Sequence, residues 1–590
     1  MCGICALLHA EQLQTGKILQ HSKILNHRGP DFCGLSHCQY LNNDGNNRYH
    51  MLGHTRLAIV SPNSGIQPIY NPTTNSLLAV NGEIYNYKQI LHDNPNIKPV
   101  TGSDCEAIMI LFNNFTIMST EEIMAKLNQL RGMFAFILID KSSGSYLIAR
   151  DSIGIIPLYY GFNNNELWIS SELKAITHCT TGNIFTPGHY SYYNSFSLQE
   201  TAGFKLKPYY QPRIDNGWSL NTKYLNYSYQ QTKQELRNIL ISAVQSHLMA
   251  DVPFGCLLSG GLDSSIIASI VRNIMLKDQP LHTFSIGIDK LSPDLQAAQQ
   301  MVTYLQQIGP IQHHEIIFTI QQALDLLYVV IYHLETFDCT TIRASTPMII
   351  LAMYIKSTNI KMVLSGEGAD ELLGGYLHFK QAPDSTEFKL ECERLMLNLH
   401  RKDCLRANKS TMAAGVELRV PFLDTDVVNF LMSINPEYKM CHNKIEKHLL
   451  REACQDILPD SIYSRQKEQF SDGVGYSWID GLKQYAEQQY PNFNIEQASK
   501  IYLAKTPRTA EEFLYRTIFN ELFEQHNNSL NNDSLNNDNS LNNDNKAWIT
   551  DTVSWEKSIS CSSEKALQWN KNWHNNPDPS GRSLDHHHNF

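Results

Sequence analysis

Short apolar segments separated by polar turns characterise roughly the first 205 residues of the chain. Their length and spacing predict strands, and two amphipathic stretches, Thr15–Asn26 and Asp104–Asn113, predict helices. The predicted strands are Met51–Val60, Leu77–Val80, Met133–Ile139, Tyr146–Ala149 and Leu167–Ile169. This pattern is typical of an α+β region dominated by antiparallel sheet.

The rhythm changes at about Thr232, where helix-length segments begin to alternate with short apolar strands. The predicted elements are the helices Lys233–Leu248, Ser264–Met275 and Gln296–Gln307 and the strands Phe254–Leu258, Leu281–Ile286 and Lys361–Leu364. This βαβ alternation predicts a parallel, doubly wound sheet. We therefore expect domains at residues 2–207 and 230–525, joined by a Tyr-, Asn- and Pro-rich linker at 208–229.

The C-terminal region has a different composition again. The pentapeptide SLNND occurs three times, beginning at Ser529, Ser534 and Ser540. Because this tract offers few groups to bury, we expect a disordered insertion at 526–546, followed by a tail at 547–590.

Charge and cysteine usage exclude several classes of protein. With 48 basic and 58 acidic residues, the net charge of −10 argues against a protein that binds nucleic acid by neutralising phosphates. The 13 cysteines are scattered and form no CxxC pair, so no disulfide scaffold, zinc site or redox motif is indicated. No apolar run approaches the ~20 residues that span a membrane, and the N-terminus lacks a basic signal-peptide region. We expect a cytoplasmic protein with reduced thiols that has no membrane or nucleic-acid partner.

The first candidate site begins at Cys2. Trimming of the initiator Met would leave this thiol beside its own α-amine, whose pKa of about 7.7–8.0 suits a base near neutral pH. Asn81 and Gly82, after a predicted strand, offer an amide and a backbone N–H for an oxyanion hole. Arg56 and Asp104 supply the two charges that match a free amino acid.

These residues belong to the motifs MCGI, NHRGPD, GHTRL, NGEIYN, TGSDCE and RGMFAF, and over roughly residues 2–200 the chain resembles class II glutamine amidotransferases. The resemblance implies an αββα antiparallel sandwich of the N-terminal-nucleophile type, in which Cys2 attacks the glutamine amide and releases ammonia. It implies an oxyanion hole formed by Asn81 and Gly82. The glutamine-binding residues it implies are Arg56, Ile59, Val60, Asn81, Gly82, Glu83 and Asp104.

A second candidate site is the segment SGGLDSS, which follows a predicted strand and opens a predicted helix. Ser259, Gly260 and Gly261 have little side-chain bulk, so their backbone N–H groups can surround phosphate oxygens. Ser264 falls in the first helical turn, where the helix dipole favours anions. Asp263, within the loop, suits a Mg²⁺ ion bridging to pyrophosphate, and no Walker A lysine follows.

Three carboxylates follow the strand that ends in Ser365-Gly366: Glu367, Asp370 and Glu371. At the carboxyl end of a parallel strand they would line the crevice in which such sheets bind ligands. There they can hold Mg²⁺ or take a proton from attacking ammonia.

SGGLDSS resembles the PP-loop of ATP pyrophosphatases. The complete order of motifs, including SGEGADE, TTIRASTP, RQKEQFSDGVGYSWID, CSSEKALQW and DPSGR, is similar to that of glutamine-hydrolysing asparagine synthetases over nearly the whole chain. The family implies ATP, glutamine and aspartate as substrates, Mg²⁺ as cofactor, an ammonia passage between two domains and a homodimer. The ATP contacts it implies are Leu257, Ser259, Gly260, Gly261, Asp263, Ser264, Ile286, Ser365, Gly366 and Lys467.

The same resemblance implies roles in the second half-reaction. Asp263 and Asp370 would bind Mg²⁺-pyrophosphate, and Glu367 would support formation of β-aspartyl-AMP and deprotonate ammonia. The candidates for aspartate or pyrophosphate binding, expected in a loop before a helix at Ser345–Ile355, are Thr340, Thr341 and Arg343. For Arg343 the alternative is a structural pair with a buried acid.

Two other functions are compatible with this architecture. A β-lactam synthetase-like enzyme keeps the PP-loop and uses another acceptor, but it does not need an N-terminal cysteine nucleophile. A non-catalytic regulatory homologue is expected to have lost acids or loop glycines, and no matched position is missing here.

Overall fold

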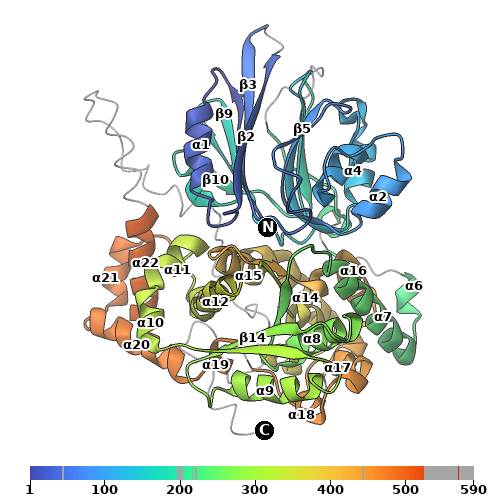
Figure 1. The fold of residues 1–590 in the computed structure, drawn as a ribbon. Helices are drawn as coiled ribbons and strands as arrows, with labels where there is room; N and C mark the ends of the chain where they lie inside the picture. The colour runs from blue at the N-terminus through green and yellow to red at the C-terminus, as the bar shows by residue number, and fades with distance from the viewer. Residues whose placement is uncertain are drawn as a thin grey trace.

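A computed structural model describes residues 1–42, 45–195, 204–215, 217–218, 222–441, 444–468 and 470–523, together with Ala566 and Trp569. The predicted Asn-rich insertion lies outside these residues. So does the predicted tail at 547–590, except for Ala566 and Trp569. The described chain forms two lobes, and the N-terminus lies at their junction (Figure 1). We call them the N-terminal lobe, which holds β1 to β12, and the C-terminal lobe, which begins at α7.

The N-terminal lobe contains two six-stranded antiparallel sheets with the orders β10-β8-β9-β1-β3-β2 and β12-β11-β7-β6-β5-β4. The first consists of β1 Gly3–Ala10, β2 Phe32–Leu41, β3 Asn47–Arg56, β8 Tyr159–Asn163, β9 Glu166–Ser170 and β10 Thr181–Ile184. The second consists of β4 Ile69–Asn71, β5 Ser76–Ile84, β6 Gly132–Asp140, β7 Tyr146–Arg150, β11 His189–Tyr193 and β12 Lys207–Pro208.

Helices cover the outer faces of both sheets. Helix α1 (Thr15–Lys23) flanks the first sheet, and α2 (Tyr87–Asp93) and α4 (Thr120–Leu127) flank the second (Figure 1). The layers are therefore helix, sheet, sheet and helix, which confirms the predicted αββα sandwich. The predicted helix at Asp104–Asn113 is a short 3₁₀ turn followed by α3 (Ala107–Leu111).

Two strands of this lobe differ from the prediction in ways that matter for the first site. Strand β5 is buried along its whole length and runs to Ile84, so Asn81, Gly82 and Glu83 lie on the strand and not after it. Strand β3 ends at Arg56, and residues 57–60 leave the sheet. Strand β1 was not predicted, because a strand buried on both faces shows no alternation.

The C-terminal lobe is built on a five-stranded, all-parallel sheet of order β15-β14-β13-β16-β17. Its strands are β13 Phe254–Leu257, β14 Leu281–Gly287, β15 Ile311–Ile317, β16 Met362–Leu364 and β17 Glu417–Arg419. Helices α8 (Leu262–Ile274) and α9 (Pro293–Leu305) lie on one side of β14, and α12 (Cys339–Ser357) and α15 (Asp403–Met412) on the other (Figure 1). The doubly wound prediction is confirmed.

Strand order reverses at β13, which pairs with β14 on one side and β16 on the other. The carboxyl ends of two such strands diverge, and ligands bind in the crevice between them. The loop after β13 is the predicted phosphate loop, and the loop after β16 carries the predicted carboxylates. The fold therefore brings these two distant segments to one place.

The segment predicted as a linker contains the short helices α5 (Gln211–Ile214) and α6 (Thr222–Leu225). Helix α7 (Tyr229–His247) begins at its end, where Ser228 and Gln231 form a capping box. Within the described residues every cysteine is a free thiol. No helix in that part of the chain is long and apolar enough to cross a membrane.

Candidate active sites

Cys2 lies at the lobe junction, directly before β1. Its backbone N–H donates to Asn81 Oδ1 at 2.8 Å, and its carbonyl oxygen accepts from Arg28 Nε at 2.9 Å. The thiol contacts the Leu57 carbonyl oxygen at 3.9 Å. Burial raises the pKa of the Cys2 thiol, so this nucleophile needs a base. The structure thus brings together the predicted nucleophile and the predicted oxyanion-hole amide.

The backbone beside the nucleophile has no room for a side chain at Gly82. Its φ is +136°, and a Cβ atom there would lie 2.0 Å from the Met133 carbonyl oxygen. The amide of Asn81 is held by Ser171, whose Oγ accepts from Asn81 Nδ2 at 3.3 Å and from the Ile4 N–H at 2.9 Å. Ser171 was not found by sequence reasoning, because it belongs to no recognised motif.

Three buried acidic side chains lie close to Cys2 and Asn81. Glu83, Asp104 and Glu417 lie around one guanidinium, that of Arg419, which is 3.5 Å from Glu83 and 2.7 Å from Glu417. Burial raises the pKa of Glu83 well above its usual range and that of Asp104 to about 6. Glu83 Oε2 has no hydrogen-bond partner within the described residues. The Met1 ammonium pairs with Glu417 in the same cluster, so these acids already accommodate an amino-terminal cation.

Arg56 and the loop after β3 complete the predicted glutamine site. The Arg56 guanidinium donates to the carbonyl oxygens of Val60 at 3.3 Å and Ser61 at 2.9 Å, which holds the loop that contains Ile59. The C-terminal lobe fixes the same loop through Asp251, whose N–H donates to Ile59 O at 3.1 Å and whose Oδ2 accepts from Ser61 N–H at 2.7 Å.

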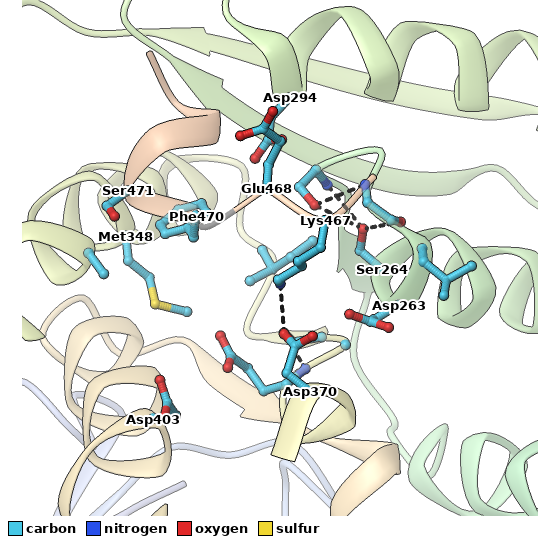
Figure 2. Close-up of a pocket in the computed structure, with 18 of the residues that line it drawn as sticks. Asp263, Ser264, Asp294, Met348, Asp370, Asp403, Lys467, Glu468, Phe470 and Ser471 are labelled. Atoms are coloured by element: carbon cyan, nitrogen blue, oxygen red, sulfur yellow. Dashed lines mark hydrogen bonds and ion pairs between the residues drawn. The ribbon is translucent and has the colours of Figure 1, made fainter. Parts of the chain in front are cut away.

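A separate cleft opens at the carboxyl ends of β13, β14 and β16 (Figure 2). It is lined by the predicted residues Leu257, Ser259, Gly261, Asp263, Ser264, Ile286, Thr340, Thr341, Ser365, Gly366, Glu367, Asp370 and Lys467. Gly260 is not in this wall. Its φ is +67°, and a Cβ atom there would lie 2.3 Å from the Ala297 backbone, so Gly260 permits the loop to pack on α9.

Two lysines neutralise the acids of this cleft. Lys447 Nζ lies 2.6 Å from Asp263 Oδ2 and 2.7 Å from Asp370 Oδ1. Lys467 Nζ lies 2.7 Å from Asp370 Oδ2 (Figure 2). Burial would raise the pKa of Asp370, but the two ammonium groups outweigh it and hold that pKa far below its usual range. Lys447 was missed, because it comes from a segment 184 residues from Asp263.

The residues of the cleft fit a divalent cation. Asp263 lies in the first turn of α8, not in the loop before it, and its Oδ1 is buried without a partner in the described part of the chain. An unpaired carboxylate oxygen beside a phosphate loop is a suitable ligand for Mg²⁺. Asp370, on α13 (Ala369–Leu373), supplies a second carboxylate in the same place.

Glu367 is the carboxylate suited to proton transfer. Burial raises its pKa, although Arg406 Nη2 at 2.9 Å partly offsets the rise. Arg406 also contacts Asp403 Oδ1 at 3.0 Å. The neighbouring Glu371, whose pKa burial raises well above its usual range, accepts a hydrogen bond from Tyr376.

Known proteins match both lobes. A family model described as asparagine synthase matches residues 235–393 and 381–550, and a glutamine amidotransferase domain model matches residues 1–202. "Asparagine synthetase [glutamine-hydrolyzing] 2" of Oryza sativa subsp. japonica is 43% identical, over 99% of this chain and 92% of its own length. "Asparagine synthetase B [glutamine-hydrolyzing]" of Escherichia coli (strain K12) is 42% identical, over 97% of this chain and 96% of its own length.

The chain belongs to the glutamine-hydrolysing asparagine synthetases. The family resemblance predicted from the sequence is thereby confirmed. Among solved structures, a glutamine phosphoribosylpyrophosphate amidotransferase from B. subtilis is similar at 17% identity and a TM-score of 0.31, over 53% of this chain and 81% of that one.

Arg343, which the family resemblance made a candidate for aspartate or pyrophosphate binding, lies outside the cleft. Helix α12 begins at Cys339, capped by Asp338, so Thr340, Thr341 and Arg343 lie on the helix and not in a loop before it. Thr340 and Thr341 reach the cleft, but Arg343 does not line it. Its guanidinium is buried against Glu511 of α22 (Ala510–Phe523), with Nε–Oε1 at 2.8 Å and Nη2–Oε2 at 2.6 Å. This geometry favours the structural alternative for Arg343.

Helix α15 of this family member contacts both sites. Arg406 reaches Glu367 in the cleft at the carboxyl ends of β13, β14 and β16, whereas Asn408 Oδ1 accepts from Arg28 Nη2 at 2.9 Å, and Arg28 holds the Cys2 carbonyl. Lys409, one residue on, pairs with Glu335. The Glu335 carboxylate accepts backbone N–H bonds from residues 173 and 174 of the N-terminal lobe, at 2.9 and 2.7 Å.

Proposed function

We propose that this chain makes asparagine from aspartate, with glutamine as nitrogen donor and ATP as energy source. Aspartate and ATP give β-aspartyl-AMP and pyrophosphate. Glutamine and water give glutamate and ammonia, and ammonia displaces AMP from the adenylate to give asparagine. The observation that carries the proposal is that one chain holds two sites, the Cys2–Asn81 pair and a cleft in which Lys447 and Lys467 contact the acids. Helix α15 connects them through Asn408 and Arg406.

In the first half-reaction Cys2 acts as the nucleophile. Removal of Met1 turns the Cys2 nitrogen into an amine, and Asn81 Oδ1, which already accepts from that nitrogen, orients it as the base for the thiol. The thiolate attacks the glutamine amide carbon, and Asn81 Nδ2 and the Gly82 N–H stabilise the oxyanion. Ammonia leaves, and water hydrolyses the glutamyl thioester. Glu83 and Asp104 hold the substrate ammonium, and Arg56 holds its carboxylate.

In the second half-reaction the C-terminal lobe stabilises charge on ATP. Ser259, Ser264 and backbone N–H groups hold the phosphates, while Lys447 and Lys467 neutralise the leaving pyrophosphate. Asp263 and Asp370 would hold Mg²⁺, which when bound supplies further positive charge against the phosphates. Glu367, with its raised pKa, takes a proton from ammonia as the new C–N bond forms.

A product assay tests the proposal. The protein is incubated with glutamine, aspartate and ATP-Mg²⁺, and asparagine, AMP and pyrophosphate are expected in equal amounts. A β-lactam synthetase-like enzyme would release pyrophosphate only with another acceptor, and a regulatory homologue would release none. AMP and pyrophosphate without asparagine would contradict the proposed acceptor.

Three finer features rest on the family resemblance. We infer a Mg²⁺ requirement, a homodimer and action in the cytoplasm. Chelation of Mg²⁺ is expected to stop pyrophosphate release but not glutamine hydrolysis, because the metal belongs to one site only. Light scattering is expected to give twice the chain mass of 67.3 kDa. The fluorescence of a C-terminal fusion is expected to be distributed through the cytoplasm.

A further inference from the structure

Arg419 stands on β17 of the C-terminal lobe, but its side chain reaches the N-terminal lobe. Its Nη2 atom lies 3.5 Å from Oε2 of Glu83, on the strand that carries Asn81 and Gly82. Both side chains are buried, and these two atoms have no hydrogen-bond partner within the described residues. At this distance the charges attract although no hydrogen bond forms, so Arg419 acts on Glu83 through its charge.

The rest of the Arg419 guanidinium is held by the C-terminal lobe. Nη1 donates to the carbonyl oxygens of His247 at 2.7 Å and Met249 at 2.5 Å, at the end of α7. Nε donates to Glu417 Oε1 at 2.7 Å. These three hydrogen bonds fix the planar group, so Nη2 stays beside Glu83.

Several charged groups compete over the ionisation of Glu83. Burial raises the pKa of Glu83, and Asp104 and Glu417 raise it further, whereas Arg419 and the Met1 ammonium lower it. The Met1 ammonium is lost when Met1 is removed, a step that the proposed mechanism requires, and Arg419 remains. The other titratable groups close to Glu83 are neutral near pH 7, because their pKa values are raised: the thiols of Cys2 and Cys105 and the phenols of Tyr85 and Tyr87.

The charge of Glu83 matters for the substrate. The proposed mechanism uses Glu83 to hold the ammonium group of glutamine. An ammonium group has three donors and no acceptor, so an ionised carboxylate binds it better than a protonated acid does. Burial opposes that ionisation. A fixed guanidinium beside Glu83 therefore raises the fraction of the protein that is ready to bind glutamine.

We propose that Arg419 is a positioning residue for glutamine hydrolysis, which keeps Glu83 ionised and beside its guanidinium for the substrate ammonium. The inference rests on the proposed function and deepens it, because it assigns part of the glutamine site to the C-terminal lobe. Arg419 does not touch the substrate itself and acts only through Glu83.

Glutamine hydrolysis by the full chain, measured as a function of pH, tests the proposal. In Arg419→Gln the KM for glutamine is expected to rise about ten-fold near pH 7 while kcat stays within about two-fold, because the ammonium is bound before and during the reaction. The pH of half-maximal kcat/KM is expected to rise by about one unit, and Arg419→Lys, which keeps the charge, is expected to restore most of that shift. The matched control is Arg272→Gln, which also removes a buried guanidinium that donates to backbone carbonyls, at the far end of α8. Its KM and pH midpoint are expected to match wild type.

A double variant provides the second measurement. In a Glu83→Gln background, Arg419→Gln is expected to change the KM for glutamine by less than about two-fold, because the acid on which it acts is gone. Circular dichroism checks folding, and if Arg419→Gln alone does not fold, Arg419→Lys is compared in the same two backgrounds. An unchanged KM and pH midpoint, or an equal effect with and without the Glu83 carboxylate, would overturn the role of Arg419. Absence of glutamine hydrolysis in wild type would instead contradict the proposed function.

Discussion

The acidic side chains of the two sites have pKa values shifted in opposite directions. Around Cys2, the carboxylates of Glu83, Asp104 and Glu417 lie near the Arg419 guanidinium and the Met1 ammonium, and burial raises the pKa of Glu83 and Asp104. In the cleft of the C-terminal lobe, Asp370 lies between Lys447 and Lys467, which lower its pKa. Carboxylates with raised pKa values therefore characterise the first site, and a carboxylate paired with two lysines characterises the second.

This contrast also shows how the chain separates its two chemistries. Carboxylates that bind an ammonium group would repel ATP, and lysines that bind phosphates would repel a cationic group. Glu83 and Asp104 belong to the N-terminal lobe, whereas Glu417 and Arg419 stand on β17 of the C-terminal lobe, so both lobes contribute charged groups to the first site. Substitutions in one site are expected to leave the other working.

The largest expected effect is at Cys2. Cys2→Ala removes the nucleophile, so glutamine-dependent asparagine synthesis is expected to vanish while synthesis from added ammonium chloride stays within about two-fold of wild type. Product chromatography measures both activities. Cys105→Ala is the matched control, because Cys105 is a buried thiol near Gly82 with no assigned role, and it is expected to keep both activities. Loss of both activities in Cys2→Ala would contradict the separation of sites.

Lys447 tests the other side of the comparison. Lys447→Met leaves Asp263 and part of Asp370 unneutralised and removes a charge that stabilises leaving pyrophosphate. We expect kcat/KM for ATP to fall roughly 10²–10³-fold, whereas glutamine hydrolysis changes little. Pyrophosphate release and glutamate formation are measured separately. Lys444→Met, at a half-exposed position nearby that contacts Glu452 at 3.9 Å and the Tyr229 ring at 5.6 Å, is expected to behave like wild type.

Glu367 sharpens the contrast within one site. Glu367→Ala is expected to stop pyrophosphate release while Cys2 still hydrolyses glutamine, because the carboxylate lies in the cleft proposed to bind ATP. Glu367→Gln keeps the size and loses the base, so a rate that no longer rises with pH would identify proton transfer as its role. Unchanged asparagine synthesis in both variants would remove Glu367 from the mechanism.

The acid-rich site predicts a pH-dependent stability. The folded-state pKa of Asp104 is about 6, above its ordinary value of 3.8. As the pH rises through this interval the unfolded chain loses the proton first, so ionisation costs the folded state on the order of 1–3 kcal/mol. Asp104→Asn avoids that cost. Its thermal midpoint relative to wild type is expected to rise between pH 4.5 and 7.5, while that of the surface control Asp93→Asn stays constant.

The smallest expected effect concerns an exposed contact between the lobes. Lys361 Nζ lies 2.7 Å from Asp31 Oδ2, with both side chains about one-third exposed. Surface pairs of this kind are worth about 0–1 kcal/mol. Lys361→Met is therefore expected to change the thermal midpoint by a degree or less and both activities not at all. A large fall in the amount of asparagine formed per glutamine hydrolysed would mean that exposed pairs, and not the buried contacts of Arg28, hold the lobes together.

The sequence allowed the contiguous part of each site to be predicted. Cys2, Asn81 and the phosphate loop stand in short motifs whose chemistry is local. Lys447 and Ser171 could not be predicted, because they meet their partners only through the fold. Helix α12 was placed six residues too late, since its first turn, Cys339–Arg343, looks polar and only the Asp338 cap shows that the helix has begun. Strand β1 was lost for the opposite reason, since complete burial removes the polar signal.

Helix α15 restricts how this enzyme can be re-engineered. Arg406, Asn408 and Lys409 leave the same helix within four residues, yet they serve three different partners. One inserted residue would rotate everything after it by about 100° and detach those partners at once. A chimera that takes its N-terminal lobe from a relative therefore needs a matching α15, although that helix lies some two hundred residues beyond the junction in sequence. The natural unit of exchange is defined by contacts and not by the order of the chain.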